Sequence, residues 1–218
     1  MKNRQIILFD VDGVLVHGYH ARPELRKCWD ENLQRDFGID REQFKSKFIY
    51  GAFTKNVLIG ESSLQEELAI CLPTLGYRGD PQIFIDYWLR NDANINQSLI
   101  TKIKLLKESG QTRLFIATNQ EHNRVQFLMN KLGFSDFFED IFYSARIGVT
   151  KPGKAYFDWI AEHLRLTPGQ KPIFFDDTPA VIESARNYGW EAIEYIDEDV
   201  LNQSVFVRTI LSQDRAIT

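Results

Sequence analysis

Four carboxylates occur in two pairs, and each pair directly follows a short apolar segment. Asp10 and Asp12 follow one such segment near the N-terminus, and Asp176 and Asp177 follow another near the C-terminus. If the four carboxylates converge, they cannot all stay ionised without a counter-charge. Mg²⁺ supplies that charge, because it binds a few carboxylate and carbonyl oxygens while keeping waters and contacting phosphate. The acidic pairs therefore predict a magnesium site.

Three polar residues add hydrogen-bond donors to this set. Thr118 and Asn119 follow a third apolar segment, and Lys151 precedes a segment with helical spacing. Hydroxyl, amide and ammonium groups are all suited to phosphate oxygens. A Thr-Asn turn, a Lys-Pro-Gly loop or an Asp-Asp-Thr-Pro helix cap is common without any catalytic role. Their joint occurrence after successive apolar segments favours a site that handles phosphate.

The apolar segments are short and continuous and are bounded by turn residues, which is typical of buried strands in a parallel sheet. They alternate with amphipathic helices, so the pattern predicts right-handed βαβ units and an α/β, Rossmann-like parallel sheet. The carboxyl ends of its strands form one edge, where open α/β sheets bind ligands. The predicted strands are 5–9, 114–117, 141–143, 173–175 and 192–196.

One long stretch interrupts the alternation. About seventy residues pass without a convincing strand, which indicates a helical insert after the first strand. We expect residues 1–18 and 93–218 to form the α/β core and residues 19–92 the insert, with residues 13–22 as a mobile loop or small hairpin. The predicted insert helices are 23–37, a segment capped by Asp40 and closed by Gly51, 62–75 with a Ser62–Gln65 capping box, and a segment that starts at Asp80-Pro81.

Composition excludes several classes of function. The chain has 218 residues, of which 44% are hydrophobic and 26% charged, and its net charge is −4. Without a long basic run, nucleic-acid binding is disfavoured. No apolar stretch is long enough to span a membrane or serve as a signal peptide, so we expect a cytoplasmic protein with Cys28 and Cys71 as buried free thiols. The sequence does not indicate an oligomeric state.

In its motifs the chain resembles a known family, the haloacid dehalogenase-like hydrolases, in the branch that carries a helical cap after the first strand. Four motifs of that family have counterparts here in the same order, and together they span most of the chain. The counterparts are Asp10-Val11-Asp12-Gly13-Val14, Phe115-Ile116-Ala117-Thr118-Asn119, Lys151-Pro152 and Phe175-Asp176-Asp177. The resemblance implies that residues 19–92 form the cap.

The resemblance also implies a role for each motif residue. Asp10 would attack phosphorus and form an aspartyl-phosphate. Asp12 would protonate the leaving group and then deprotonate the attacking water. Thr118, Asn119 and Lys151 would bind the phosphoryl oxygens, and Lys151 would neutralise their charge.

The expected cofactor is Mg²⁺, and the second acidic pair would help to hold it. Asp177 is the preferred direct ligand, with Asp176 as a further ligand or a neighbour of one. The full expected ligand set is Asp10, the backbone carbonyl of Asp12, Asp176 and Asp177. The family's dehalogenases lack an aspartate two residues after the nucleophile, so Asp12 favours phosphate transfer.

The expected activity is hydrolysis of a small organic phosphomonoester, with a small phosphorylated metabolite as the partner. A phosphomutase that acts on a sugar phosphate is one alternative, because it would use the same aspartyl-phosphate chemistry. A catalytically silent binding module that keeps the fold is another. The presence of every expected catalytic residue weighs against the silent module.

Overall fold

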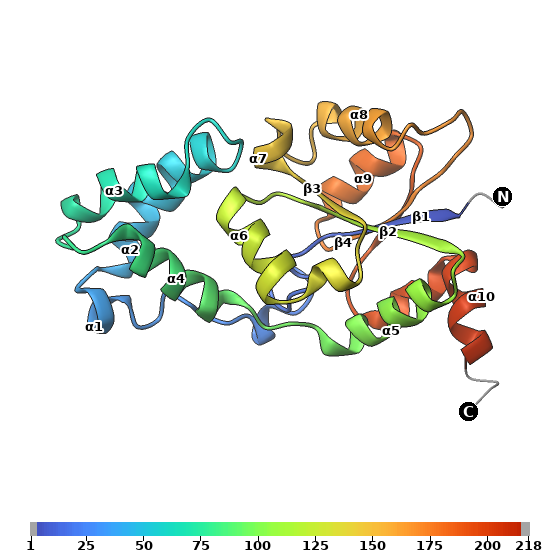
Figure 1. The fold of residues 1–218 in the computed structure, drawn as a ribbon, viewed down its shortest axis with the longest axis horizontal. Helices are drawn as coiled ribbons and strands as arrows, with labels where there is room; N and C mark the ends of the chain where they lie inside the picture. Colours follow the sequence, from blue (N-terminus) through green and yellow to red (C-terminus); the bar gives the residue numbers. More distant parts are fainter. Residues whose placement is uncertain (1–3, 215–218) are drawn as a thin grey trace.

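The computed structural model describes residues 4–214. Its centre is a five-stranded parallel sheet with the strand order β3-β2-β1-β4-β5 (Figure 1). The strands are β1 (Gln5–Phe9), β2 (Thr112–Thr118), β3 (Asp140–Tyr143), β4 (Ile173–Asp176) and β5 (Glu191–Glu194). This confirms the α/β fold class, and each predicted strand lies within two residues of its expected bounds.

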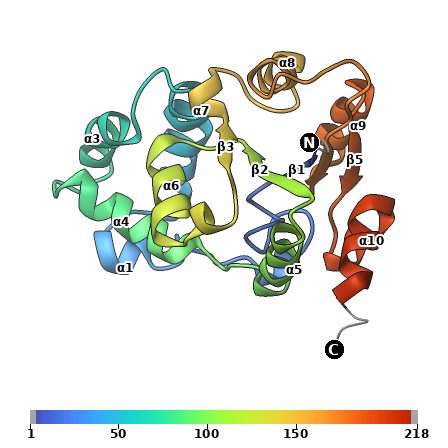
Figure 2. The same ribbon diagram turned by 45° about the vertical axis from the view of Figure 1, so that its right-hand side comes forward.

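Helices cover both faces of the sheet because successive strand residues point to opposite sides. Ile7 and Phe9 pack toward α5 and α10, whereas Ile6 and Leu8 pack toward α8 and α9. Figure 2 shows α5 and α10 on one side of the sheet and α8 on the other. The core helices are α5 (Gln97–Glu108), α6 (His122–Gln126), α7 (Ser144–Ile147), α8 (Lys154–His163), α9 (Pro179–Asn187) and α10 (Val205–Asp214). A π-helical segment (Phe127–Lys131) continues α6, and short 3-10 turns occupy Phe134–Asp136 and Glu198–Gln203.

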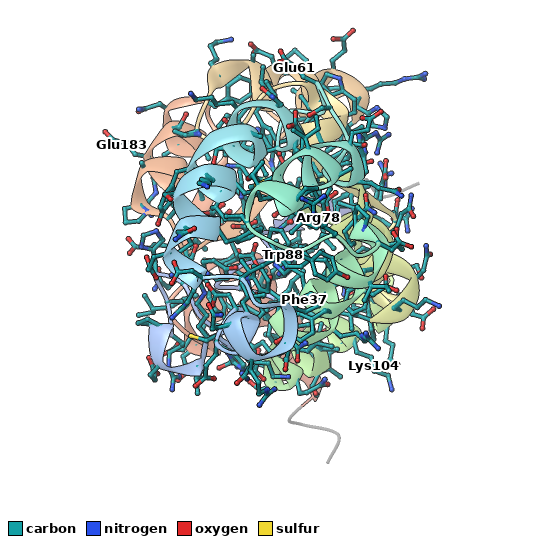
Figure 3. The ribbon with its side chains drawn as sticks, turned by 90° about the vertical axis from the view of Figure 1, so that its left-hand side faces the viewer. Phe37, Glu61, Arg78, Trp88, Lys104 and Glu183 are labelled. Carbon is teal, nitrogen blue, oxygen red and sulfur yellow. The ribbon has the colours of Figure 1, made fainter. Side chains whose placement is uncertain are left out.

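Between β1 and α5 the chain is helical and lies to one side of the sheet (Figure 1). Its elements are a 3-10 turn (Pro23–Leu25), α1 (Leu33–Phe37), α2 (Arg41–Phe44), a π-helical segment (Lys45–Val57), α3 (Leu64–Thr74) and α4 (Pro81–Asp92). These elements, called the insert below, bury an aromatic cluster of their own, in which Trp29 stacks on Trp88 at 4.4 Å. Figure 3 faces this side and labels Phe37 and Trp88 among its side chains. The exact limits of the core and of the insert stay a prediction.

Two local predictions in the insert were wrong, and a third was confirmed. Residues 23–37 do not form one helix, because Trp29 packs into the aromatic cluster and the chain bends around it. The predicted helix end at Gly51 is confirmed, because its backbone is non-helical at φ −112° and ψ −111°; a further helical stretch then continues to Val57. The capping box of α3 is one residue later than predicted and consists of Ser63 and Glu66. The predicted caps Asp40 and Asp80 are confirmed.

The segment after β1 is better anchored than a free loop or hairpin. It forms a series of turns in which residues 14–16 are buried. The N–H of His17 donates to the carbonyl of Asn94 at 2.8 Å, which fixes the segment to the end of the insert. Cys28 is exposed and Cys71 half-buried, so the expectation of two buried thiols was wrong. Within residues 4–214, no helix has the length and apolar character needed to cross a membrane.

Candidate active site

A buried ion-pair network lies at the carboxyl edge of the sheet. Asp10 follows β1, and its N–H donates to the carbonyl of Phe175 on β4 at 2.9 Å. The Lys151 ammonium lies 3.0 Å from Asp10 Oδ1 and 2.5 Å from Asp176 Oδ2, and donates to the Ala117 carbonyl at 3.0 Å. Asp10, Asp176 and Lys151 are all under 10% exposed. The sheet thus brings together two strand ends and one loop that are far apart in sequence.

Burial controls the protonation of this network. Burial raises the pKa of Asp10 to about 8; Lys151 opposes the shift and Asp176 adds to it. Burial alone would lower the pKa of Lys151, but the two carboxylates outweigh it and raise that pKa. The raised pKa of Asp10 reflects a buried network with more carboxylates than its ammonium can neutralise.

Asp177 completes an acidic cluster at this edge. One carboxylate oxygen from each of Asp10, Asp176 and Asp177 lies within 4.8 Å of the others. Burial and Asp176 raise the pKa of Asp177, while N–H groups of His20 and Ala21 lower it by donating to Oδ2 at 2.9 and 3.3 Å. Three carboxylates at this spacing, with only one ammonium among them, have the donor atoms and the charge to hold a hard divalent cation.

Gly13 makes room for the second acidic pair. Its φ of +83° is a conformation that side-chain-bearing residues rarely adopt. A Cβ at this position would lie 1.7 Å from Asp177 Oδ2. Gly13 therefore allows both the turn after β1 and the close approach of Asp177.

A cavity of about 230 Å³ opens onto this cluster. Most of the predicted site residues contribute to its wall, and Asp176 lies buried behind them. The lining residues are Asp10, Asp12, Tyr19, His20, Thr118, Asn119, Lys151, Pro152, Asp177, Thr178 and Val181. The structure thus brings together all seven residues that the sequence singled out.

Asn119 has a structural task at this cavity. Its amide donates to the Lys151 carbonyl at 3.1 Å and accepts the Lys151 N–H at 2.8 Å. The two bonds fix the loop that carries Lys151 to the end of β2. Thr118 is 1% exposed and lines the same cavity.

A second cavity, of about 390 Å³, extends from the first toward the insert. Asp12, Tyr19 and Asn119 line both cavities. Aromatic and charged side chains of the insert form much of the remaining wall, and they include Arg26, Trp29, Asp30, Lys45, Tyr50, Phe53, Trp88 and Asp92. The two cavities are therefore neighbours, one at the acidic cluster and the other at the insert.

Sequence reasoning missed three residues of this site. Tyr19 lines both cavities. Gln120 Nε2 donates to Asp12 Oδ2 at 2.5 Å, and Arg124 Nη2 donates to Asp12 Oδ1 at 2.7 Å. Gln120 directly follows a motif, which was a usable signal. Arg124 adjoins the buried Val125 on a helix and gave no signal of its own.

Comparison with known proteins agrees with this architecture. A family model described as haloacid dehalogenase-like hydrolase matches residues 5–189. The chain is 24% identical over 183 residues to the putative HAD-hydrolase YfnB of Bacillus subtilis, which covers 82% of this chain and 77% of that protein.

Solved structures show the same fold. HAD family enzyme BT-2542 of Bacteroides thetaiotaomicron matches with a TM-score of 0.72 at 18% identity, over 91% of this chain and 97% of that one. L-2-haloacid dehalogenase of Xanthobacter autotrophicus matches with a TM-score of 0.59 at 19% identity, over 99% and 88%. With its family match spanning most of the sequence, this chain belongs to the haloacid dehalogenase-like hydrolases and is a hydrolase.

Proposed function

We propose that this hydrolase is a Mg²⁺-dependent phosphatase that cleaves a small organic phosphomonoester through an aspartyl-phosphate on Asp10. The observation that carries the proposal is the placement of Asp10 and Asp12 on one cavity, beside the acidic cluster and Lys151. Carbon–halogen cleavage needs no proton for its leaving group, whereas an alkoxide leaving from phosphate does. Asp12 therefore favours phosphate ester cleavage, although dehalogenases share the fold.

The residues at the acidic cluster fit the proposed metal. Asp10, the backbone carbonyl of Asp12 and Asp177 would hold it, since Asp177 lines the cavity and Asp176 is paired with Lys151. Bound Mg²⁺ would lessen the repulsion between a carboxylate nucleophile and a phosphate dianion. The B. thetaiotaomicron enzyme has been crystallised with magnesium and inorganic phosphate, which supports the assignment.

The chain's own groups supply the remaining chemistry. A carboxylate oxygen of Asp10 attacks phosphorus, and the ester oxygen leaves with a proton from Asp12. Water then attacks the aspartyl-phosphate while Asp12 takes its proton, which releases phosphate and restores Asp10. Thr118 and Lys151 hold the phosphoryl oxygens and offset the charge that spreads over them.

The second cavity supports a small organic leaving group. It is lined by rings of the insert, including Trp29, Phe53 and Trp88, and adjoins Asp12, which would face the ester oxygen. We therefore propose that the insert acts as a cap and contacts the alcohol part of a small phosphorylated metabolite. Water excluded by this cap would strengthen the electrostatic interactions below it.

A panel of phosphomonoesters tests the proposal directly. We expect Mg²⁺-dependent release of inorganic phosphate from at least one small ester, lost in the presence of a chelator and in Asp10→Asn. An isomerised sugar phosphate without net release would instead indicate a phosphomutase. Mg²⁺ binding without turnover of any ester would indicate a silent binding module. Halide release from a 2-haloacid would contradict the proposal and place the chain among the dehalogenases.

A further inference from the structure

Both carboxylate oxygens of Asp12 accept hydrogen bonds from side chains in or just before α6. Arg124 Nη2 donates to Oδ1 at 2.7 Å, and Gln120 Nε2 donates to Oδ2 at 2.5 Å. Arg124 is 8% exposed and Gln120 4% exposed, so the two donors are screened little by solvent. The orientation of Asp12 is therefore set by two residues outside the family motifs that carry the resemblance.

The other end of the Arg124 guanidinium points to the insert. Its Nη1 donates to Asp92, which is 6% exposed and is the last residue of α4. Among residues 4–214, Arg124 Nε has no hydrogen-bond partner, and the two carboxylates supply the side-chain hydrogen bonds of this guanidinium. One cation is shared by two carboxylates, which leaves one unit of negative charge when all three are ionised. Arg124 thus orients Asp12 without fully compensating its charge.

The helix that carries Arg124 is firmly attached to the core. Glu121 caps α6 by accepting N–H bonds from residues 123 and 124. The carbonyl of Gln120 accepts bonds from Ser144 Oγ at 3.2 Å and Ala145 N at 3.1 Å. Of the two carboxylates bonded to Arg124, Asp92 is the one that belongs to the junction between insert and core.

We propose that Arg124 is the positioning residue of Asp12 and, through Asp92, ties the placement of this acid–base group to the junction between α4 and the core. The inference rests on the proposed phosphatase function and deepens it. A shift of the insert at this junction would move Asp92 and, through the shared guanidinium, Asp12. The insert would then influence proton transfer as well as contact the leaving group.

Leaving-group dependence separates positioning from a merely structural role. p-Nitrophenolate departs without a proton, whereas the alkoxide of 2-phenylethyl phosphate requires one from Asp12. We expect Arg124→Ala to lower kcat for the alkyl ester at least about tenfold more than kcat for the nitrophenyl ester, as part of the 10²–10⁴-fold typical of general acid catalysis. Asp12→Ala sets the maximum of this selective loss. Arg124→Lys should recover part of it, because an ammonium can reach one carboxylate but not span both.

A double-mutant cycle and a matched arginine sharpen the test. Once Asp12 is removed, Arg124→Ala should cause no further selective loss, since the two residues act as one unit. Asp92→Asn should cause a smaller selective loss, because Arg124 still reaches Asp12. Arg146, which pairs with Asp140 at 2.9 Å and is one-third exposed, provides the control. Arg146→Ala should leave the ratio of the two rates unchanged, and equal losses on both esters in Arg124→Ala would overturn the proposal.

A crystal structure of Arg124→Ala with Mg²⁺ gives a readout that needs no turnover. The Asp12 carboxylate should leave its present orientation or occupy two. An unchanged Asp12 would refute positioning by Arg124. If the wild-type protein hydrolyses no ester of the panel, the phosphatase proposal fails, while this structural comparison still decides the role of Arg124.

Discussion

The sheet edge and the insert are stabilised in opposite ways. At the sheet edge, three carboxylates and an ammonium are buried together, each under 10% exposed. In the insert the buried groups are mostly aromatic and aliphatic, and a pair such as Arg41 with Asp30 lies at the boundary with solvent. Buried like charges are costly to keep. Their concentration at one edge indicates that catalysis, rather than stability, explains the core site, whereas packing explains the insert.

Removing one cationic side chain from each region should give the largest difference in the free energy of unfolding. Lys151→Met leaves Asp10 and Asp176 buried without their partner, and should cost about 3–5 kcal/mol in the free energy of unfolding without Mg²⁺. It should also lower phosphatase kcat by at least about 10²–10³-fold. Arg41→Met removes a side chain that is 41% exposed and should cost about 1 kcal/mol or less. Urea unfolding in the presence of a chelator measures the free energy of unfolding of both variants. Equal costs would contradict the expected difference between the sheet edge and the insert.

Replacing one buried phenylalanine in each region separates the effect of packing on stability from its effect on the metal site. Phe44 is fully buried in the insert, and Phe174 is fully buried on β4, with the Lys151 ammonium 5.5 Å from its ring centre. Each change to Ala should cost about 3–5 kcal/mol of unfolding free energy. Only Phe174→Ala should weaken Mg²⁺ binding, measured by calorimetry. Weaker Mg²⁺ binding in Phe44→Ala would show that the insert's packing also shapes the metal site.

The two regions also differ in how well their sequences predict them. Three of the five core strands, β1, β2 and β4, are apolar runs that end in functional residues, so local sequence was enough to predict these strands and the edge that they share. In the insert, Trp29 has helical spacing with its neighbours, yet it stacks on Trp88 and interrupts the predicted helix. Packing between distant aromatic residues overrides local propensity there.

The same limit explains which site residues were missed. Asp12 and Lys151 lie within motifs, whereas the partners of Arg124 lie 112 and 32 residues away along the chain. No spacing rule connects such residues, because the contact depends on how α6 and the end of α4 meet. The three-dimensional structure is what shows that Asp12 and Asp92 share the Arg124 guanidinium.

The pH dependence of Mg²⁺ stabilisation should also distinguish the regions. Burial raises the pKa of Asp10 to about 8, so without metal its protonated form favours the folded state at acidic pH. That contribution is full below pH 4 and is lost as pH rises toward 8. Mg²⁺ must displace this proton, so the rise in Tm that it causes should grow between pH 5 and 8. Asp10→Asn should lose most of this pH dependence and keep the part that comes from the raised pKa of Asp177, whereas Arg41→Met should keep all of it.

That change in Mg²⁺-induced Tm is measured by thermal unfolding at matched ionic strength with Mg²⁺ or a chelator. A rise in Tm that is the same at pH 5 and pH 8 would contradict a proton on Asp10 in the metal-free protein. Lys151 stays charged over this range because its own pKa is raised, so it does not produce the effect.

The smallest expected difference concerns two helix caps of the same kind. Asp40 accepts the N–H of Gln43 at the surface of the insert, and Glu121 accepts the N–H groups at the start of α6 beside Gln120 and Arg124. Asp40→Ala should cost about 1 kcal/mol, or roughly 2–4 °C in Tm, without changing any rate ratio. Glu121→Ala should cost a similar amount or somewhat more, and should also slow the alkyl ester selectively, since Glu121 lies between the two donors to Asp12, Gln120 just before α6 and Arg124 on it. If both changes left the ratio of alkyl to nitrophenyl ester rates untouched, the start of α6 would support the fold alone, and the control of Asp12 would have to lie elsewhere.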